Sequence, residues 1–132
     1  MADTMKLQVI CPDRIFYEGE VSMVELPTTE GEIGISPRHL PLPCILAPGV
    51  MAITENAEMK IAAVHSGFVQ ILPEKVTVMA EVAEWPDEID LDRAQAAKER
   101  AQERMKLKDN STDVARAETA LQRAVARINT LK

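Results

Sequence analysis

The spacing of apolar residues changes at Trp85-Pro86, and this change constrains the fold of the 132-residue chain more than any other feature. Before that point apolar and polar residues alternate, as in a strand with one buried face. In the last such segment the expected core-facing side chains are Val76, Val78, Ala80 and Val82, and the expected outward-facing ones are Thr77, Met79, Glu81 and Ala83. After that point the apolar residues recur every three or four positions and form one helical stripe, made of Val114, Ala117, Leu121, Ala124, Ile128 and Leu131. The sequence therefore predicts a β domain followed by an α-helical segment.

Short strand-like runs fill the front of the chain, and Pro, Gly and Asn residues separate them. The runs predicted as strands are 7–10, 15–17, 21–26, 32–35, 50–53, 59–64, 68–72 and 76–83. Many short strands with closely spaced turns indicate a β-sandwich or flattened barrel rather than βαβ units. No Gly-rich phosphate loop precedes a helix, which disfavours a nucleotide-binding α/β fold.

The back of the chain is predicted to form two antiparallel helices. The first begins within residues 87–90, where acidic side chains suit the positive end of a helix dipole, and ends near Leu107. Asn110-Ser111-Thr112 interrupts the pattern and offers caps for a second helix that continues to Leu131. The connection is short, so the helices fold back on each other. We expect a β-sandwich over residues 1–84 and a regulatory helical hairpin over residues 85–132.

Alanine dominates the expected contact between the two helices. The residues predicted to meet there are Ala94, Ala97, Ala101 and Met105 from the first helix and Ala117 and Ala124 from the second. An Ala in place of a Leu gives up about three methylene-scale groups, each worth about 0.8 kcal/mol when buried. We therefore expect a closely packed hairpin that is weakly held and able to open, although the periodicity is equally compatible with an ordinary helical hairpin.

The charge is unevenly distributed along the chain. Residues 1–86 hold five Lys and Arg against 12 Asp and Glu, a net charge of −7, and residues 87–132 hold ten against nine, a net charge of +1. The acidic front argues against nucleic acid as a partner. Cys11 and Cys44 have no metal-binding spacing and are predicted to be free buried thiols, so no metal is expected. No run approaches the roughly 18 apolar residues of a membrane span, so direct membrane insertion is not expected.

Four arginines of the predicted hairpin suggest a binding site for anions. Arg123 and Arg127 lie one helical turn apart, and neither has an acidic residue three or four positions away. On the first helix Arg93 and Arg100 share a face, and Asp90 lies three residues before Arg93. Guanidinium groups that converge from two helices would bind phosphates or acidic side chains. Solvated arginines near a helix C-terminus are the alternative, and the sequence leaves both open.

Two motifs carry a resemblance to a known family. The segment TEGEIGISPRHLPL at residues 29–42 resembles the turn-and-strand signature of the epsilon subunit of F-type ATP synthases, and IDLDRA at residues 89–94 resembles the I(L)DxxRA motif that opens that family's C-terminal hairpin. Both occur in the family's order, and the resemblance covers essentially the whole chain. The chain departs from it at His65-Ser66-Gly67-Phe68, where the family usually has a second glycine, so the local turn there is not carried over. Trp85-Pro86 is also atypical and is expected to stiffen the hinge.

The resemblance implies a non-catalytic subunit of the central stalk, located peripherally on the cytoplasmic face of the cell membrane. Its sandwich would contact the gamma subunit and the c-ring, and would couple proton translocation to ATP synthesis in the alpha and beta subunits. Its hairpin would alternate between a compact state and an extended state that inhibits ATP hydrolysis. No cofactor is required, and ATP is expected as a regulatory ligand.

The resemblance also implies two sets of site residues. The ATP site of the compact hairpin would comprise Glu84, Ile89, Asp90, Arg93, Ala94, Arg100, Arg123 and Arg127. Within it Asp90 would orient Arg93 or accept a hydrogen bond from the nucleotide, and Ala94 would leave room for the base. The rotor interface would comprise Gly31, Glu32, Gly34 and His39. There Glu32 would offer its carboxylate to the c-ring, and the two glycines would permit the turn geometry.

Two other function classes are weighed against this one. A small hydrolase needs a nucleophile and a base, but His39 and His65 are the only histidines, and no GxSxG motif or acidic partner occurs at a recognisable spacing. A small ligand-binding β-barrel with an unrelated helical tail is the stronger alternative. It predicts a roomy apolar interior, whereas an aromatic content of 3% offers few side chains to line one.

Overall fold

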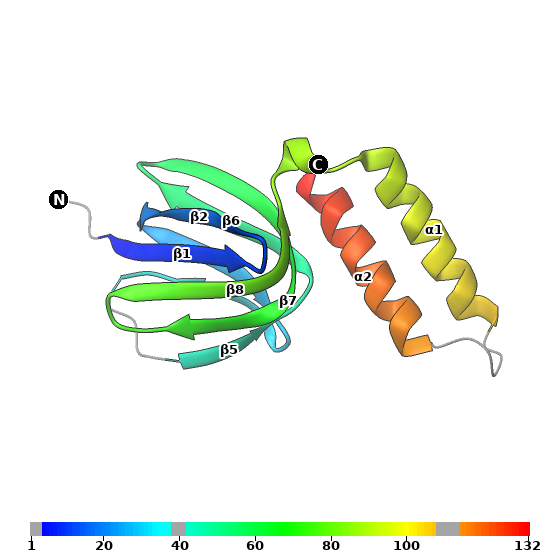
Figure 1. Ribbon diagram of the computed structural model, residues 1–132, viewed down its shortest axis with the longest axis horizontal. Helices are drawn as coiled ribbons and strands as arrows, with labels where there is room; N and C mark the ends of the chain where they lie inside the picture. Colours follow the sequence, from blue (N-terminus) through cyan, green and yellow to red (C-terminus); the bar gives the residue numbers. More distant parts are fainter. Residues whose placement is uncertain (1–3, 38–41, 108–113) are drawn as a thin grey trace.

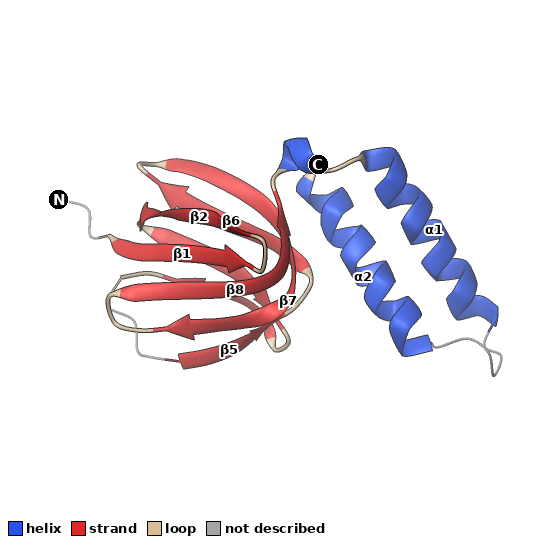
Figure 2. Ribbon diagram, in the orientation of Figure 1, coloured by secondary structure: helices blue, strands red, loops and turns tan. Residues whose placement is uncertain are grey.

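The computed structural model describes residues 4–37, 42–107 and 114–132. Within these ranges a β domain precedes two helices, so the fold class predicted from the sequence is confirmed (Figure 2). The elements are β1 (Met5–Cys11), β2 (Arg14–Val21), β3 (Met23–Thr28), β4 (Gly31–Ile35), β5 (Leu42–Leu46), β6 (Gly49–Glu55), β7 (Glu58–Ile71), β8 (Lys75–Glu84), the 3₁₀ turn η1 (Pro86–Glu88), α1 (Leu91–Leu107) and α2 (Val114–Thr130).

The β domain is a sandwich whose two sheets share one strand. One sheet runs in the order β2, β1, β8, β7 and β5, and the other contains β4, β3, β6 and the first half of β7. The strands β1 and β8 are parallel neighbours, which brings the beginning and the end of the domain together. Because β7 passes from one sheet to the other, the two sheets enclose one core as a flattened barrel.

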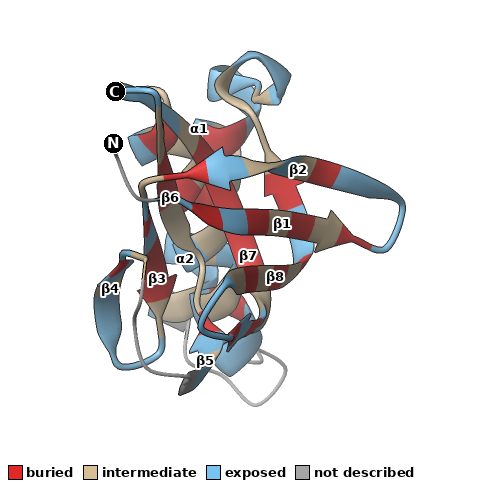
Figure 3. Cartoon of the chain, turned by 90° about the vertical axis from the view of Figure 1, so that its left-hand side faces the viewer, coloured by how far each residue is buried: buried red, intermediate tan, exposed pale blue. Residues whose placement is uncertain are grey.

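The interior of the sandwich is filled by branched and long apolar side chains. Burial alternates along β1 from Met5 to Cys11, as the period-two pattern predicts (Figure 3). The largest fully buried side chains include Leu7, Leu26, Met51 and Ile53. Cys11 is a buried free thiol, whereas the free thiol of Cys44 is only half-buried. Among the described residues, this packing gives no support to the alternative of a barrel with a roomy interior.

The strand β7 replaces two shorter strands that the sequence predicts over 59–64 and 68–72. No turn separates them, because β7 pairs with β8 in one register from Ala63 opposite Glu84 to Ile71 opposite Val76. The backbone bends instead at Ser66 and Gly67, whose φ angles are 30° and 156°. A Cβ on Gly67 would lie 2.0 Å from the carbonyl oxygen of Met79, so the close approach of the two strands requires glycine there.

The strand β5 is not among the strands predicted from the sequence, and it contains Pro43, a residue type that counts against a strand. Its Pro43 pairs with Gln70 of β7, while β5 meets β3 only where Leu46 pairs with Thr28. The missing N–H of Pro43 therefore falls on an open edge, where proline is tolerated.

The expected alternation along β8 is wrong at its end. Val82, predicted to face the core, is 36% exposed, and Ala83, predicted to face outward, is 4% exposed. The two faces exchange because β8 follows the bend of β7 at Ser66 and Gly67. As a result Val82 and Glu84 point to the outer side of the sheet.

Both predicted helices are present. Asp90 caps α1, because its carboxylate accepts a hydrogen bond from the backbone N–H of Arg93 (3.1 Å) and its carbonyl accepts one from that of Ala94 (3.0 Å). This agrees with the predicted start within 87–90. The caps predicted for α2 at residues 110–112 lie outside the described residues.

The helix α2 lies between the sandwich and α1 (Figure 1). Its contact with α1 is called the helix seam and consists of four residues no more than 3% exposed: Ala94, Ala101, Ala117 and Ala124. Ala97 and Met105, which were also predicted there, are only partly buried.

On its other side α2 packs against β6 and β7. In β6 and β7, residues 51–53 and 62–65 are buried at consecutive positions, because the core covers one face of these strands and α2 covers the other. The small residues of this contact are Ala52, Ala63 and Ala126, here called the docking seam. The hairpin is therefore docked on the sandwich, and the most deeply buried apolar residues that it contributes to both contacts are alanines.

Candidate functional site

The linker between the two domains is fixed to the sandwich. The indole of Trp85 stacks on the ring of Phe16 with centroids 4.2 Å apart. Arg14 donates to both carboxylate oxygens of Glu88, at 2.9 and 3.0 Å, and also to the carbonyl of Ala83. The Arg14 guanidinium holds the pKa of Glu88 below its usual range. The chain is therefore held to the sandwich as far as Glu88.

A cavity of about 380 Å³ lies between this linker and the two helices. Its lining comprises Glu84, Glu88, Asp90, Arg93, Ala94, Ala97, Arg100 and Arg127. Six of these belong to the set predicted to bind ATP: Glu84, Asp90, Arg93, Ala94, Arg100 and Arg127. The docked hairpin thus brings together residues from the end of β8, from the start of α1 and from the last turn of α2.

The carboxylate of Glu84 joins the sandwich to α2. Its Oε1 accepts a hydrogen bond from Nε of Arg127 at 2.7 Å and lies 3.3 Å from Nε2 of His65. Arg123, one turn earlier on α2, pairs with Glu81 at 3.6 Å. The prediction that groups outside the helix neutralise these two arginines is confirmed.

Two arginines of the cavity remain available for a ligand. In the described part of the chain, neither Arg93 nor Arg100 has an ion-pair or hydrogen-bond partner for its guanidinium group. Asp90 orients Arg93 only through its backbone, because the carboxylate caps the helix. The cavity therefore offers two free guanidinium groups on α1 opposite the carboxylate of Glu84.

Two residues of the predicted ATP set lie outside the lining of the cavity. Ile89 forms the end of the 3₁₀ turn, with its N–H donating to the carbonyl of Pro86. Arg123 lies at the docking face and contacts Glu81. Conversely, Glu88 and Ala97 line the cavity but were not predicted as site residues. Ala97 lies four residues after Arg93, one turn along α1, and this spacing could have identified it, whereas Glu88 belongs to the 3₁₀ turn and has no such helical spacing.

Three of the predicted rotor residues, Gly31, Glu32 and Gly34, lie on and near the β3–β4 turn. Gly31 has a φ of 114°, which glycine adopts readily, so it permits the turn as expected. The same expectation is wrong for Gly34, which lies within β4 opposite Glu25 and has no positive φ. Glu32 is exposed and lines a hollow between the sandwich and α2. His39 lies outside the described residues.

Apolar side chains form a row across the outer face of the first sheet. Its members are cross-strand partners on five consecutive strands: Ile15, Ile10, Met79, Phe68 and Ile45. Ile15, Phe68 and Ile45 are 60%, 54% and 62% exposed. This apolar row was not predicted, because only the strand register shows that these residues are neighbours. An exposed apolar group of this kind is typical of a protein–protein contact.

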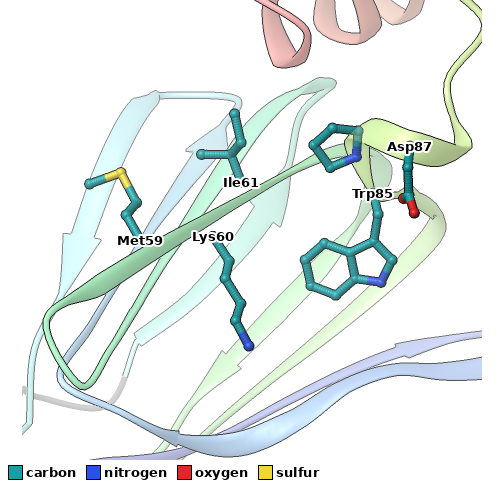
Figure 4. A pocket seen from close by; sticks show the side chains of 6 residues that line it. Met59, Lys60, Ile61, Trp85 and Asp87 are labelled. Carbon is teal, nitrogen blue, oxygen red and sulfur yellow. The ribbon is translucent and has the colours of Figure 1, made fainter.

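A second hollow, of about 480 Å³, opens where β7 begins beside the linker. Met59, Lys60, Ile61, Trp85, Pro86 and Asp87 line it, with Lys60 and Trp85 extending to the same side (Figure 4). It lies at the surface, outside the sandwich core.

Among the described residues, neither helix has the length and apolar composition needed to cross a bilayer.

Comparisons with solved structures agree with the architecture. A chain of the Euglena gracilis mitochondrial ATP synthase matches with a TM-score of 0.84 at 22% identity, over 93% of this chain and 78% of that one. A chain of the Tetrahymena thermophila mitochondrial ATP synthase matches with a TM-score of 0.65 at 14% identity, over 98% of both chains. At these identities the likeness shows the fold alone.

Sequence comparisons show the family. Residues 4–86 match the β-sandwich domain of the ATP synthase delta/epsilon chain, and residues 87–132 match its long α-helix domain. The ATP synthase epsilon chain of Halalkalibacterium halodurans is 43% identical over 96% of both chains. That of Desulfitobacterium hafniense is 46% identical over 98% of this chain and 97% of the relative. With both domains matched and relatives of this similarity over nearly the full length, the chain belongs to the ATP synthase epsilon chain family.

Proposed function

We propose that the chain is a non-catalytic subunit of the ATP synthase central stalk and that its docked hairpin binds ATP as a regulatory ligand. The stalk assignment rests on its family membership. The ATP assignment is carried by one observation, the cavity that six residues of the predicted set line together. The complex would work on the cytoplasmic face of the cell membrane, with this subunit peripheral.

The cavity suits a nucleotide in size and in charge. Its volume of about 380 Å³ falls in the range of roughly 300–1,000 Å³ that is common for ligand sites. Arg93 and Arg100 offer planar donors to phosphate oxygens, and charge-assisted bonds of this kind are worth about 1.5–3 kcal/mol each. The carboxylate of Glu84 accepts hydrogen bonds from amino or hydroxyl groups, and Ala94 leaves room for the base.

ATP would act by shifting the hairpin between two states. A ligand that binds only the docked hairpin raises its population at the expense of the extended form. The extended hairpin would reach the alpha and beta subunits and inhibit ATP hydrolysis. Because the seams are rich in alanine, the docked form is only weakly stabilised, so a bound ligand can change its population.

The rival is that the arginines serve only the extended state, where they would pair with acidic residues of the beta subunit. ATP would then leave the isolated protein unchanged. Thermal unfolding with and without millimolar ATP distinguishes the two. We expect ATP to raise the Tm of the parent and to have a much smaller effect on Arg93→Ala and Arg100→Ala.

Two further variants complete this experiment. Arg104→Ala removes an exposed arginine of the same helix, outside the cavity lining, and should keep the full ATP effect. Arg127→Ala should lose it, but this variant also loses the bond to Glu84, so the α1 variants give the cleaner answer. An absent shift in the parent, or an equal shift in every variant, would contradict ATP binding at this site.

The apolar row is the proposed contact with the gamma subunit. It lies on the outer face of the first sheet and includes three well-exposed side chains, Ile15, Phe68 and Ile45. Phe68→Glu should abolish copurification with gamma, because it places a charge within the row, between Met79 and Ile45. Met59→Glu alters a similarly exposed side chain outside the row and should leave copurification intact.

The β3–β4 turn is the proposed contact with the c-ring. Glu32 is exposed beside Gly31 and offers a carboxylate to polar loops of the ring. Charge reversal by Glu32→Lys should weaken ATP-driven proton pumping by the reconstituted complex without unfolding the subunit. Unchanged pumping would count against the contact. Because Glu32 also lines the hollow beside α2, hairpin docking should be measured in the same variant.

A further inference from the structure

His65 is a buried titratable residue outside both the apolar core and the proposed nucleotide cavity. It is 1% exposed and pairs with Val82 of β8, which places its side chain on the outer side of the sheet. There α2 covers it, since α2 packs on β7. Its Nε2 lies 3.3 Å from Oε1 of Glu84, the oxygen that also accepts from Nε of Arg127 at 2.7 Å.

The charged groups around His65 come from each neighbouring element. β8 contributes Glu84 and also Glu81, which pairs with Arg123, and α2 contributes the guanidinium groups of Arg127 and Arg123. On β6 the charged residue is Glu55, at the far end of the strand opposite Glu58. On η1, Glu88 is engaged by Arg14, and Asp87 is exposed. Two carboxylates therefore face two guanidinium groups in this region, and of the two carboxylates only Glu84 contacts the buried imidazole.

The hydrogen bonding around His65 favours the neutral ring. Among the described residues, Nδ1 of His65 and Nε of Arg123 are buried side-chain atoms without a hydrogen-bond partner. A neutral ring donates to Glu84 through Nε2–H and leaves Nδ1 as a bare acceptor, whereas a protonated ring would bury an additional unpaired N–H. Burial and the Arg127 guanidinium accordingly hold the pKa of His65 below its ordinary value.

We propose that His65 is a positioning residue for the docked hairpin: neutral, it holds Glu84 in place for Arg127, and protonated, it repels the arginine-bearing face of α2 and releases the hairpin. The proposal rests on the proposed function in one respect, namely that the hairpin has an undocked state. It adds a second input, pH, to the docking equilibrium that ATP is proposed to control.

The direction of the effect follows from linkage. In the undocked state His65 loses its burial and both guanidinium groups but keeps Glu84, so its pKa rises back toward its ordinary value. The docked state therefore binds fewer protons than the undocked state at mildly acidic pH. Docking is strongest above the undocked pKa and weakens as the pH falls below it. Between the two pKa values the docking constant falls by up to about tenfold per pH unit.

NMR of the full-length protein without nucleotide tests this proposal. Labelled histidine rings report the titration of His65, and the labelled methyl group of Ala126, which is buried in the docking seam, reports docking. Between pH 8 and pH 5.5 we expect the docked fraction of the parent to fall together with the protonation of His65. His65→Gln keeps an amide donor for Glu84 but does not titrate, so it should dock at pH 8 and lose the pH dependence. His39→Asn removes the other histidine and should keep the parent profile.

Three results would overturn the proposal. These are a pH-independent Ala126 signal in the parent, a His65 pKa in the docked protein at or above the ordinary value, and the same pH profile in His65→Gln as in the parent. The first two need no variant, so the test stands even if His65→Gln does not fold. Failure of ATP to stabilise the protein at pH 8 would retire the nucleotide site alone and leave this pH profile to be judged separately.

Discussion

The sandwich and the hairpin are held by apolar side chains of very different size. Fully buried positions of the sandwich carry Leu7, Leu26, Met51 and Ile53, whereas the helix seam and the docking seam consist of alanines. Burial of a large aliphatic side chain contributes about 1.5–3 kcal/mol, and a single methyl group contributes about 0.8 kcal/mol. We therefore expect the sandwich to be stable by itself, whereas the hairpin depends on small contacts and on the bond between Glu84 and Arg127. We also expect the hairpin to detach without unfolding the sandwich.

The largest expected effect is on the sandwich core. Leu7→Ala should lower the free energy of unfolding by about 2–5 kcal/mol, because it leaves a cavity at a position that is 0% exposed. Ile15→Ala, at a position that is 60% exposed, should change it by no more than about 0.5 kcal/mol. Urea denaturation measures both. Equal costs at the two positions would contradict the packing described for the sandwich.

A bulky residue in the docking seam should separate the two regions. Ala126→Leu overpacks the contact between α2 and the sandwich, at a cost of about 1–3 kcal/mol, which undocking relieves. We expect amide hydrogen exchange to accelerate in the hairpin and to stay slow in the sandwich strands. Ala120→Leu, at an exposed position of the same helix, is the matched control. Faster exchange in both regions of the Ala126 variant would show that the two are one cooperative unit.

Truncation locates the boundary between the two regions. The sequence places it after Glu84, but Trp85 stacks on Phe16, and Glu88 binds Arg14. Both fragments should fold, with residues 1–88 more stable than residues 1–84 by at least the roughly 0.5–1.5 kcal/mol of an aromatic pair. Thermal unfolding measures the difference, and Trp85→Leu in the longer fragment separates the stack from the ion pair. Equal stability would assign residues 85–88 to the hairpin.

The smallest expected effect concerns the outer ion pair of the hairpin. Glu81 is 63% exposed where it meets Arg123, so Glu81→Gln should weaken docking by only about 0.2–1 kcal/mol. Glu84→Gln should weaken it more, because Glu84 is less exposed and contacts both Arg127 and His65. The Ala126 methyl signal reports the docked fraction in each variant. A larger loss of docking from Glu81→Gln than from Glu84→Gln would show that the pair of Glu81 with Arg123, rather than Glu84, is the main attachment of the hairpin.

Sequence patterns that span one helical turn or one strand predicted much of the local structure correctly before the fold was known. The change of period at Trp85 separates strands from helices, because each spacing reflects the local geometry of the element. Asp90 marks the start of α1 because its carboxylate caps the next backbone amides. The missing helical partners of Arg123 and Arg127 indicated that carboxylates elsewhere must neutralise them. Six residues that line the candidate cavity belong to the set implied by the family resemblance, and the arginine spacing separately singled out three of them, Arg93, Arg100 and Arg127.

The fold class, the start of α1 and the chemical types at the hairpin could be predicted before folding was considered, because they depend on contacts between near neighbours along the chain. The folded chain was needed to show which strand bends, which face of β8 points inward and where Glu84 meets an arginine 43 residues away. The apolar row likewise depends on the register of five strands, and His65 acquires its environment only when α2 covers β7. Long-range pairing depends on the summed energy of many contacts, which no single segment of the sequence records.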